Sequence, residues 1–187
     1  MTTEKLASAR LTYEDYCQLP NDGRQREIIA GIEYMAPAPN TFHQRLLGRL
    51  YVELSLFLRQ HPIGEAFIAP YDVILSAHDV VQPDLLYVAQ EHADRVKPHG
   101  LVGAPDLAVE VLSPSNRRHD EVQKRALYAQ HGVGEYWIID PYAESILRHV
   151  LTDNGLTELA LLRVDSGDVL TSPMLPGFAL PLEKLFG

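Results

Sequence analysis

The sequence is poor in the features that mark secreted and membrane proteins. Cys17 is the only cysteine among 187 residues, so no intrachain disulfide can form and a reducing compartment is expected. Nothing in the sequence activates Cys17, and we expect it to be a small core residue. The most apolar helical stretch, residues 46–58, is interrupted by Arg49 and Glu53 and is too short to span a bilayer. These absences predict a cytoplasmic protein without a membrane partner.

Positive charge is also scarce. Sixteen Lys and Arg face 25 Asp and Glu, which leaves a formal net charge of −9. Binding to nucleic acid requires clustered cations, so the average composition argues against an extended basic surface. One local cluster departs from this average, and it comprises Arg117, Arg118, His119, Lys124 and Arg125. This cluster predicts either a local positive field or an ordinary solvated helix face.

Clustered metal-binding histidines are missing as well. The eight histidines are scattered along the chain and show neither a zinc-binding spacing nor a cysteine partner, so structural zinc is not expected. His43 lies near the start of a predicted helix, where a helix-end or surface role is expected and an approach to the site is the alternative. Ser113 and Ser115 fit a cap and loop better than a nucleophile with a catalytic base.

The hydrophobic pattern predicts one mixed α/β domain. Residues 27–35 read as two strands around a turn at Ala30 and Gly31. A long helix is expected from Asn40 or Thr41 to about residue 61, because its leucines recur at helical spacing. The other expected elements are a short capped helix after Thr12, strands at 65–69, 71–75, 84–88, 107–112, 135–140, 145–150 and 156–164, and helices at 90–97 and 118–131.

Two acidic residues interrupt strands that are otherwise apolar. Asp84 follows Pro83 at the head of one strand, and Glu110 lies between aliphatic residues inside another. A buried carboxylate is costly unless it is paired or bound to a cation. A divalent metal would stabilise two such carboxylates on neighbouring strands, and oxygen ligands suit Mg²⁺ or Mn²⁺. The pattern therefore predicts a magnesium or manganese site that can polarise a phosphoryl oxygen.

A lysine follows on the next predicted helix. Lys124 precedes Leu127 and Tyr128 at a spacing that places all three on the face toward the sheet. Its ammonium group would then lie beside the carboxylates, where it would stabilise a phosphorus transition state. Replacing Lys124 with alanine is expected to abolish turnover and to spare the fold.

Each of these residues also has a simpler interpretation. Asp84 alone fits a turn cap after Pro83, and Glu110 alone fits a strand glutamate paired with an arginine. Lys124 alone fits a surface residue paired with Asp120, four positions earlier on the helix. These alternatives remain open at the level of the sequence.

An ordered series of motifs carries a family resemblance. It runs from Pro83–Asp84 through Glu110, in Asp-Leu-Ala-Val-Glu-Val-Leu-Ser-Pro-Ser, to Lys124 and then to Glu-Tyr-Trp-Ile-Ile-Asp-Pro at residues 135–141. The series resembles a family of small bacterial proteins described as restriction endonucleases and long carried as a domain of unknown function. That family belongs to the PD-(D/E)XK nuclease superfamily, and the resemblance covers roughly residues 11–151.

The resemblance implies a fold and a set of site residues. The fold would be the restriction-endonuclease-like α/β fold, a mixed central sheet flanked by helices with extra antiparallel strands. Residues 1–187 would form one nuclease-like domain with its core at about 11–151 and C-terminal strands at 152–187 as an extension. Asp84, Glu110 and the main-chain carbonyl of Val111 would bind the metal. The superfamily's usual lysine position is Leu112 here, so Lys124 would substitute for it, and Glu27 would add a further carboxylate or only anchor its hairpin.

These features together predict a function and its partners. The leading hypothesis is a magnesium-dependent endonuclease that hydrolyses phosphodiester bonds, with DNA as the expected nucleic acid. The alternatives are a non-catalytic nucleic-acid-binding or regulatory protein with the same fold, and a metal-dependent hydrolase of a small phosphate compound. A homodimer is expected because one acidic protein of this size offers little surface to a duplex. The apolar run at 156–162 and the proline-rich closing segment would contribute to the interface or cover the protein's own sheet.

Overall fold

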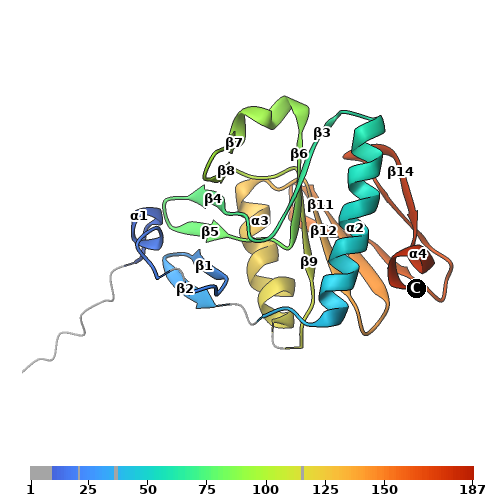
Figure 1. Ribbon diagram of the computed structural model, residues 1–187, viewed down its shortest axis with the longest axis horizontal. Coiled ribbons are helices and arrows are strands. Elements are labelled where there is room, and N and C mark those ends of the chain that lie inside the picture. Colours follow the sequence, from blue (N-terminus) through green and yellow to red (C-terminus); the bar gives the residue numbers. More distant parts are fainter. Residues whose placement is uncertain (1–9, 21, 36–37, 115) are drawn as a thin grey trace, which may run out of the picture.

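The computed structural model describes residues 10–20, 22–35, 38–114 and 116–187, so Ser115 and residues 1–9 lie outside the described chain. In chain order the elements are α1 (Tyr13–Tyr16), β1 (Arg26–Ile29), β2 (Ile32–Met35), α2 (Thr41–Gln60), β3 (Gly64–Ile68), β4 (Val73–Ser76), β5 (Asp79–Val81), β6 (Leu85–Ala89), η1 (Gln90–Arg95), β7 (Val96–Lys97), β8 (Gly100–Val102), β9 (Leu107–Val111), η2 (His119–Lys124), α3 (Arg125–His131), β10 (Glu135–Asp140), β11 (Ser145–Thr152), β12 (Gly155–Arg163), β13 (Val169–Ser172), β14 (Leu175–Pro181) and α4 (Leu182–Phe186). The strands form two six-stranded sheets and one two-stranded sheet, and Figure 1 shows the long helix α2 on one side of the central strands and α3 on the other.

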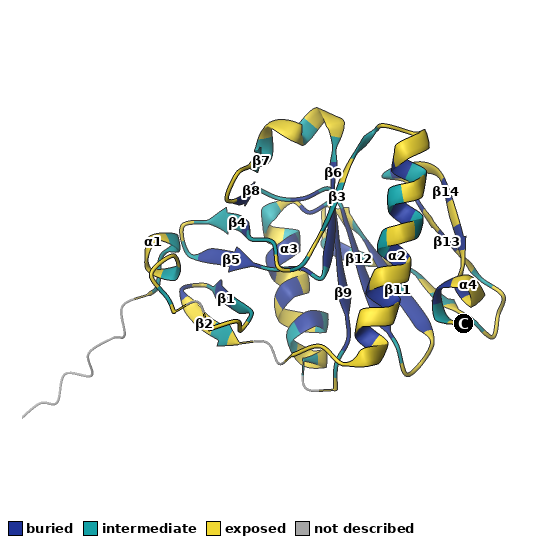
Figure 2. Cartoon of the chain, viewed as in Figure 1, coloured by how far each residue is buried: buried dark blue, intermediate teal, exposed yellow. Residues whose placement is uncertain are grey.

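The central sheet is mixed. Its strand order is β12-β11-β10-β9-β6-β3, with β9 and β10 parallel and the other neighbours antiparallel. Every residue of β9 and β10 is buried, which explains why their sequences are nearly continuous apolar runs. Figure 2 shows these central strands in dark blue and the outer face of α2 in yellow. The mixed α/β class that the sequence predicts is confirmed.

Helices cover both faces of this sheet. Leu46, Leu50 and Leu54 of α2 pack against one face, which carries Trp137. Asn40 caps α2 by accepting a hydrogen bond from the backbone N–H of His43 at 3.0 Å, so the predicted cap is confirmed. Leu127 and Tyr128 of α3 pack on the opposite face, together with strands of the second sheet. The short helix α1 begins with the expected capping box of Thr12 and Asp15.

The second sheet has the order β2-β1-β5-β4-β8-β7. Its β1–β2 hairpin turns at Ala30 and Gly31, both with positive φ, as the sequence predicts. The three-residue strands β5 and β8 and the two-residue β7 were not predicted, because runs this short show no periodicity. This sheet places the hairpin beside the start of β6 and the end of β9, where the candidate site lies.

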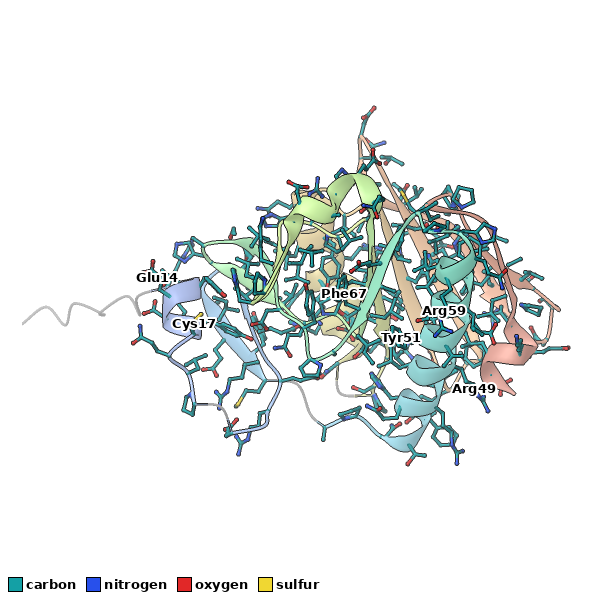
Figure 3. All side chains as sticks on the ribbon, turned by 45° about the horizontal axis from the view of Figure 1, so that its top comes forward. Glu14, Cys17, Arg49, Tyr51, Arg59 and Phe67 are labelled. Atoms are coloured by element: carbon teal, nitrogen blue, oxygen red, sulfur yellow. The ribbon has the colours of Figure 1, made fainter. Side chains whose placement is uncertain are left out.

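The C-terminal segment packs on the protein's own core. β13 and β14 form an antiparallel pair, and Leu170, Leu180, Leu182 and Leu185 belong to the cluster that α2 covers. Arg49 of α2, labelled in Figure 3, donates a hydrogen bond to the carbonyl oxygen of Leu185 at 3.0 Å. Residues 170–185 are therefore part of the main core, and the proline-rich segment covers its own molecule.

Two details differ from the sequence-based expectations. Cys17, labelled in Figure 3, is exposed at the end of α1, so its prediction as a core residue is wrong. The predicted helix 118–131 begins with a π-helical turn, η2, before α3 continues it. Within the described chain, no helix is long and apolar enough to cross a membrane.

Candidate active site

The predicted site residues line one cavity of about 490 Å³. The cavity lies where the N-terminal end of α2, the C-terminal end of β9 and the start of η2 meet beside the β1–β2 hairpin (Figure 1). Four carboxylates line it, from Glu27, Asp84, Glu110 and Asp120, together with the ammonium group of Lys124. The structure thus brings together residues that lie as far as 97 positions apart in the sequence, from 27 to 124.

Asp84 lies directly before β6, and its side chain is held from two sides. Its Oδ2 accepts a hydrogen bond from the backbone N–H of Val111 at 2.8 Å and lies 2.9 Å from Nε2 of His43. Leu112 directs its N–H toward β10, where it binds the carbonyl oxygen of Ile139. Backbone groups alternate sides along a strand, so the N–H of Val111 points toward Asp84 and that of Leu112 toward β10. Pro83 and the end of β9 therefore hold the Asp84 carboxylate against the backbone of Val111.

Glu110 and Lys124 form a buried ion pair. The Lys124 Nζ lies 2.8 Å from Oε1 of Glu110 and 2.8 Å from Oε1 of Glu27. The same Oε1 of Glu110 accepts a hydrogen bond from the hydroxyl of Tyr128 at 3.0 Å. Lys124 is 5% exposed, so the alternative that places it on the surface is wrong, although Asp120 does lie near it, at 3.8 Å.

Glu27 reaches the cavity from the hairpin. Its Oε1 accepts a hydrogen bond from the backbone N–H of Gln82 at 2.8 Å, and its Oε2 lies 3.4 Å from Nε2 of His119. Tyr34 is its cross-strand neighbour on β2, and the Tyr34 ring lies 4.8 Å from that of His119. Glu27 thus does more than anchor the hairpin, because it contacts Lys124 directly.

Burial and mutual repulsion shift the pKa values of these groups. Burial raises the pKa of Glu110 well above its ordinary value despite Lys124, and nearby carboxylates raise it further. Burial likewise raises the pKa of Asp120 to about 6. Burial acts to raise the pKa of Glu27 too, but Lys124, His119 and the Gln82 N–H outweigh it and hold that pKa at about 2.

The lysine responds in the opposite sense. Burial acts to lower the pKa of Lys124, but Glu110, Glu27 and Asp120 outweigh that effect and raise the pKa well above its ordinary value. Lys124 is therefore a permanent cation near neutral pH. It is suited to stabilising negative charge and unsuited to accepting a proton.

The donor set fits a divalent cation of the hard, oxygen-preferring kind. Among the described residues, no group of three or more His, Cys, Asp or Glu side chains is arranged to hold a metal ion. The expected ligand set contains only two such side chains, Asp84 and Glu110, and is completed by the main-chain carbonyl of Val111, so it is smaller than a group of three. An ionised carboxylate has about four acceptor positions, which leaves Asp84 and Glu110 capacity beyond their present hydrogen bonds. The excess of four carboxylates over one lysine also favours an added cation.

The predicted basic cluster does not form one positive patch. Arg117 pairs with Asp140 and with Glu121, and Lys124 is buried in the site. Arg118 and Arg125 are exposed. Of the two interpretations, a mostly solvated helix face fits these residues better.

Three contacts of the site were not predicted. His43 is buried against Asp84, His119 lies beside Glu27, and Tyr128 binds Glu110. His43 was expected at a helix end or on the surface, and the signal that points inward is its position three residues before Leu46, on the buried stripe of α2. Tyr128 had a comparable signal, because it lies four residues after Lys124 on the face that packs on the sheet.

The comparisons with known proteins agree with this geometry. A family model named Uma2, described as "Putative restriction endonuclease", matches residues 13–183, and the chain belongs to this family. No curated protein matches the chain. A crystal structure from Anabaena variabilis, described as that of a "putative nuclease belonging to DUF820", is similar with a TM-score of 0.79 and 18% identity. The match covers 94% of this chain and 97% of that chain. The chain has the restriction-endonuclease-like fold that the resemblance implies.

Proposed function

We propose that this protein is a metal-dependent endonuclease that hydrolyses phosphodiester bonds, with DNA as the expected nucleic acid. The observation that carries the proposal is the meeting of Asp84, Glu110 and Lys124 in one cavity, with Glu27 as a further carboxylate. A structural role alone leaves such a cluster unexplained, because surplus buried carboxylates destabilise a fold.

Each residue has a role that follows from its contacts. Asp84, Glu110 and the Val111 carbonyl would hold Mg²⁺ or Mn²⁺. When bound, such an ion lowers the pKa of a coordinated water and withdraws charge from a phosphoryl oxygen. Lys124, a permanent cation, stabilises the charge that develops as the water oxygen bonds to phosphorus and the ester oxygen departs. Glu27 orients the Lys124 ammonium through their 2.8 Å contact.

The metal site is tested by titration calorimetry with Mn²⁺. Wild-type protein should bind the ion, and the double variant Asp84→Asn/Glu110→Gln should lose that binding. Glu53→Gln is the matched control, because Glu53 is a carboxylate paired with Lys184 on the surface. Full-strength binding by the double variant would remove Asp84 and Glu110 from the proposed metal site.

Cleavage is tested with plasmid and oligonucleotides in Mg²⁺ or Mn²⁺, beside an EDTA control. Loss of product in EDTA and in the double variant is expected. Binding of nucleic acid without any product would favour the alternative, a non-catalytic nucleic-acid-binding or regulatory protein. Turnover of small phosphate esters alone would favour the small-substrate hydrolase.

A homodimer belongs to the same proposal. The edge strand β12 pairs with β11 alone among the described strands, and its Leu159 and Leu161 are 50% and 44% exposed. An exposed apolar edge of this kind favours pairing with a second copy. Sedimentation at micromolar concentration tests this, and a single species near 21 kDa with or without DNA would exclude the dimer.

A further inference from the structure

The reacting groups lie deep in the cavity. Glu27 and Glu110 are each 4% exposed and Lys124 is 5% exposed, and the whole cavity measures about 490 Å³. A nucleic-acid duplex has a persistence length of about 150 base pairs, so bending it to bring one phosphate into a hollow of this size costs about 1–6 kcal/mol. A single strand bends at every nucleotide and can enter.

The cavity wall offers little charge to a sugar-phosphate backbone. Among the described residues that line it, Lys124 is the one lysine or arginine, and it is already paired with two carboxylates. Affinity from neutralised phosphates is therefore small. Another source of binding energy is needed beside the site.

One wall supplies that source as an aromatic surface. Tyr34 lies on β2 directly opposite Glu27 and lines the cavity, and its ring centroid lies 4.8 Å from that of His119. Met35, which is 56% exposed, and Pro39 continue this wall with apolar surface. Stacking on an aromatic ring binds any base by its face and does not depend on phosphate charge.

We infer that the cavity takes a single-stranded segment of nucleic acid, with one base stacked on Tyr34 and the adjoining phosphate beside Asp84 and Glu110. The inference rests on the nuclease function proposed above and adds its substrate class. Glu27 connects Tyr34 with the reacting groups, because it is the cross-strand neighbour of Tyr34 and contacts Lys124. The arrangement explains how an acidic protein binds nucleic acid without a basic groove.

Fluorescence anisotropy tests the inference without relying on turnover. Labelled DNA single strands, RNA single strands and DNA duplexes of one sequence are titrated with protein in EDTA and again with Ca²⁺. We expect at least one kind of single strand to bind about tenfold or more tighter than the duplex. The comparison of DNA with RNA then identifies the preferred single strand. Tyr34→Ala should weaken single-strand binding by about 5- to 150-fold, the range for loss of one stacked base.

Matched variants separate stacking from a general loss of structure. Tyr34→Phe keeps the ring and should recover most of the affinity that Tyr34→Ala loses, whereas Tyr34→Leu keeps apolar volume without a ring and should not. Tyr13→Ala removes a partly buried tyrosine from α1, outside the cavity lining, and should bind as wild type does. Figure 3 shows α1, marked by Glu14 and Cys17, at the far end of the molecule from α2. Circular dichroism confirms that each variant is folded.

Cleavage of the same oligonucleotides in Mn²⁺ distinguishes failure of the inference from failure of the proposed function. Equal cleavage of duplex and single strand, unchanged in Tyr34→Ala, would overturn the inference and leave the nuclease standing. Tyr34-dependent binding of single strands without product would support the inference and overturn the nuclease. Absence of both binding and cleavage overturns both.

Discussion

Replacing Lys124 with methionine tests how strongly the site depends on one buried cation. Lys124 contacts Glu27 and Glu110 at 2.8 Å each, and all three residues are no more than 5% exposed. The substitution keeps the length and apolar stem of the side chain and removes its charge, so it leaves two buried carboxylates without a counter-charge. Removing one partner of a buried ion pair costs about 3–5 kcal/mol.

The lower end of that range is expected. Burial already raises the pKa of Glu110 well above its ordinary value, so Glu110 takes up a proton in the variant and relieves part of the repulsion. A loss of about 3 kcal/mol lowers the Tm of a protein of this size by about 6–12 °C. Thermal and urea unfolding followed by circular dichroism measure both quantities. The burial of Lys124 thus revises the expectation that removing this lysine spares the fold.

Two further variants make the result interpretable. Lys184→Met is the matched control, because Lys184 also lies 2.8 Å from a carboxylate, that of Glu53, but its side chain is 60% exposed. It should change stability by no more than about 0.5 kcal/mol. Glu27→Gln in the Lys124→Met background should restore stability, with a coupling of about 1–3 kcal/mol. A loss below about 1 kcal/mol in Lys124→Met, equal to that of the control, would refute the reasoning.

Four other substitutions have definite expected outcomes. Burial and a nearby arginine lower the pKa of His149, so the unfolded chain takes up a proton at this residue before the folded chain does, and stability falls below about pH 6.5. His149→Phe should remove this part of the pH dependence of stability, which urea unfolding between pH 5 and 8 measures. Gly48→Ala, in an open position on α2, should stabilise the protein by about 1 kcal/mol, whereas Gly64→Ala, whose added methyl group meets a β6 carbonyl, should lower the Tm. Tyr128→Phe removes a hydrogen bond to the buried carboxyl group of Glu110 and should cost about 0.5–1.5 kcal/mol in urea unfolding, and an unchanged midpoint would contradict that bond.

Much of the fold was predictable because periodicity is strong in its long elements. The leucine stripe and the Asn40 cap identify α2, and the apolar run at Glu135–Asp140 matches β10 at both ends. The short strands β5, β7 and β8 were missed, because two or three residues cannot display a period. The π-helical turn of η2 was missed for a different reason, since its hydrogen-bond register leaves no mark on side-chain spacing.

The site was predictable in its members and less so in its contacts. Asp84 and Glu110 stood out because a charge in an apolar strand is costly, and that argument needs no coordinates. The partners of these carboxylates could not be predicted by the same argument. His43 reaches Asp84 across 41 positions, and the contact of Lys124 with Glu27 depends on how the second sheet lies against the first. Such contacts follow from tertiary packing, which one sequence does not encode in local patterns.

A second buried ionic cluster contrasts with the one around Lys124. Glu135 is fully buried, and its carboxylate accepts hydrogen bonds from Arg148 at 2.6 Å, Trp137 at 2.9 Å and Ser172. One acid there faces one base and both carboxylate oxygens accept hydrogen bonds, so the cluster joins β10, β11 and β13. Around Lys124, by contrast, acids outnumber bases and open onto a cavity. A fold that can satisfy a buried carboxylate so completely at one position has no structural need for a surplus of them at another. The surplus therefore supports the proposal that the cavity binds a cation and a substrate.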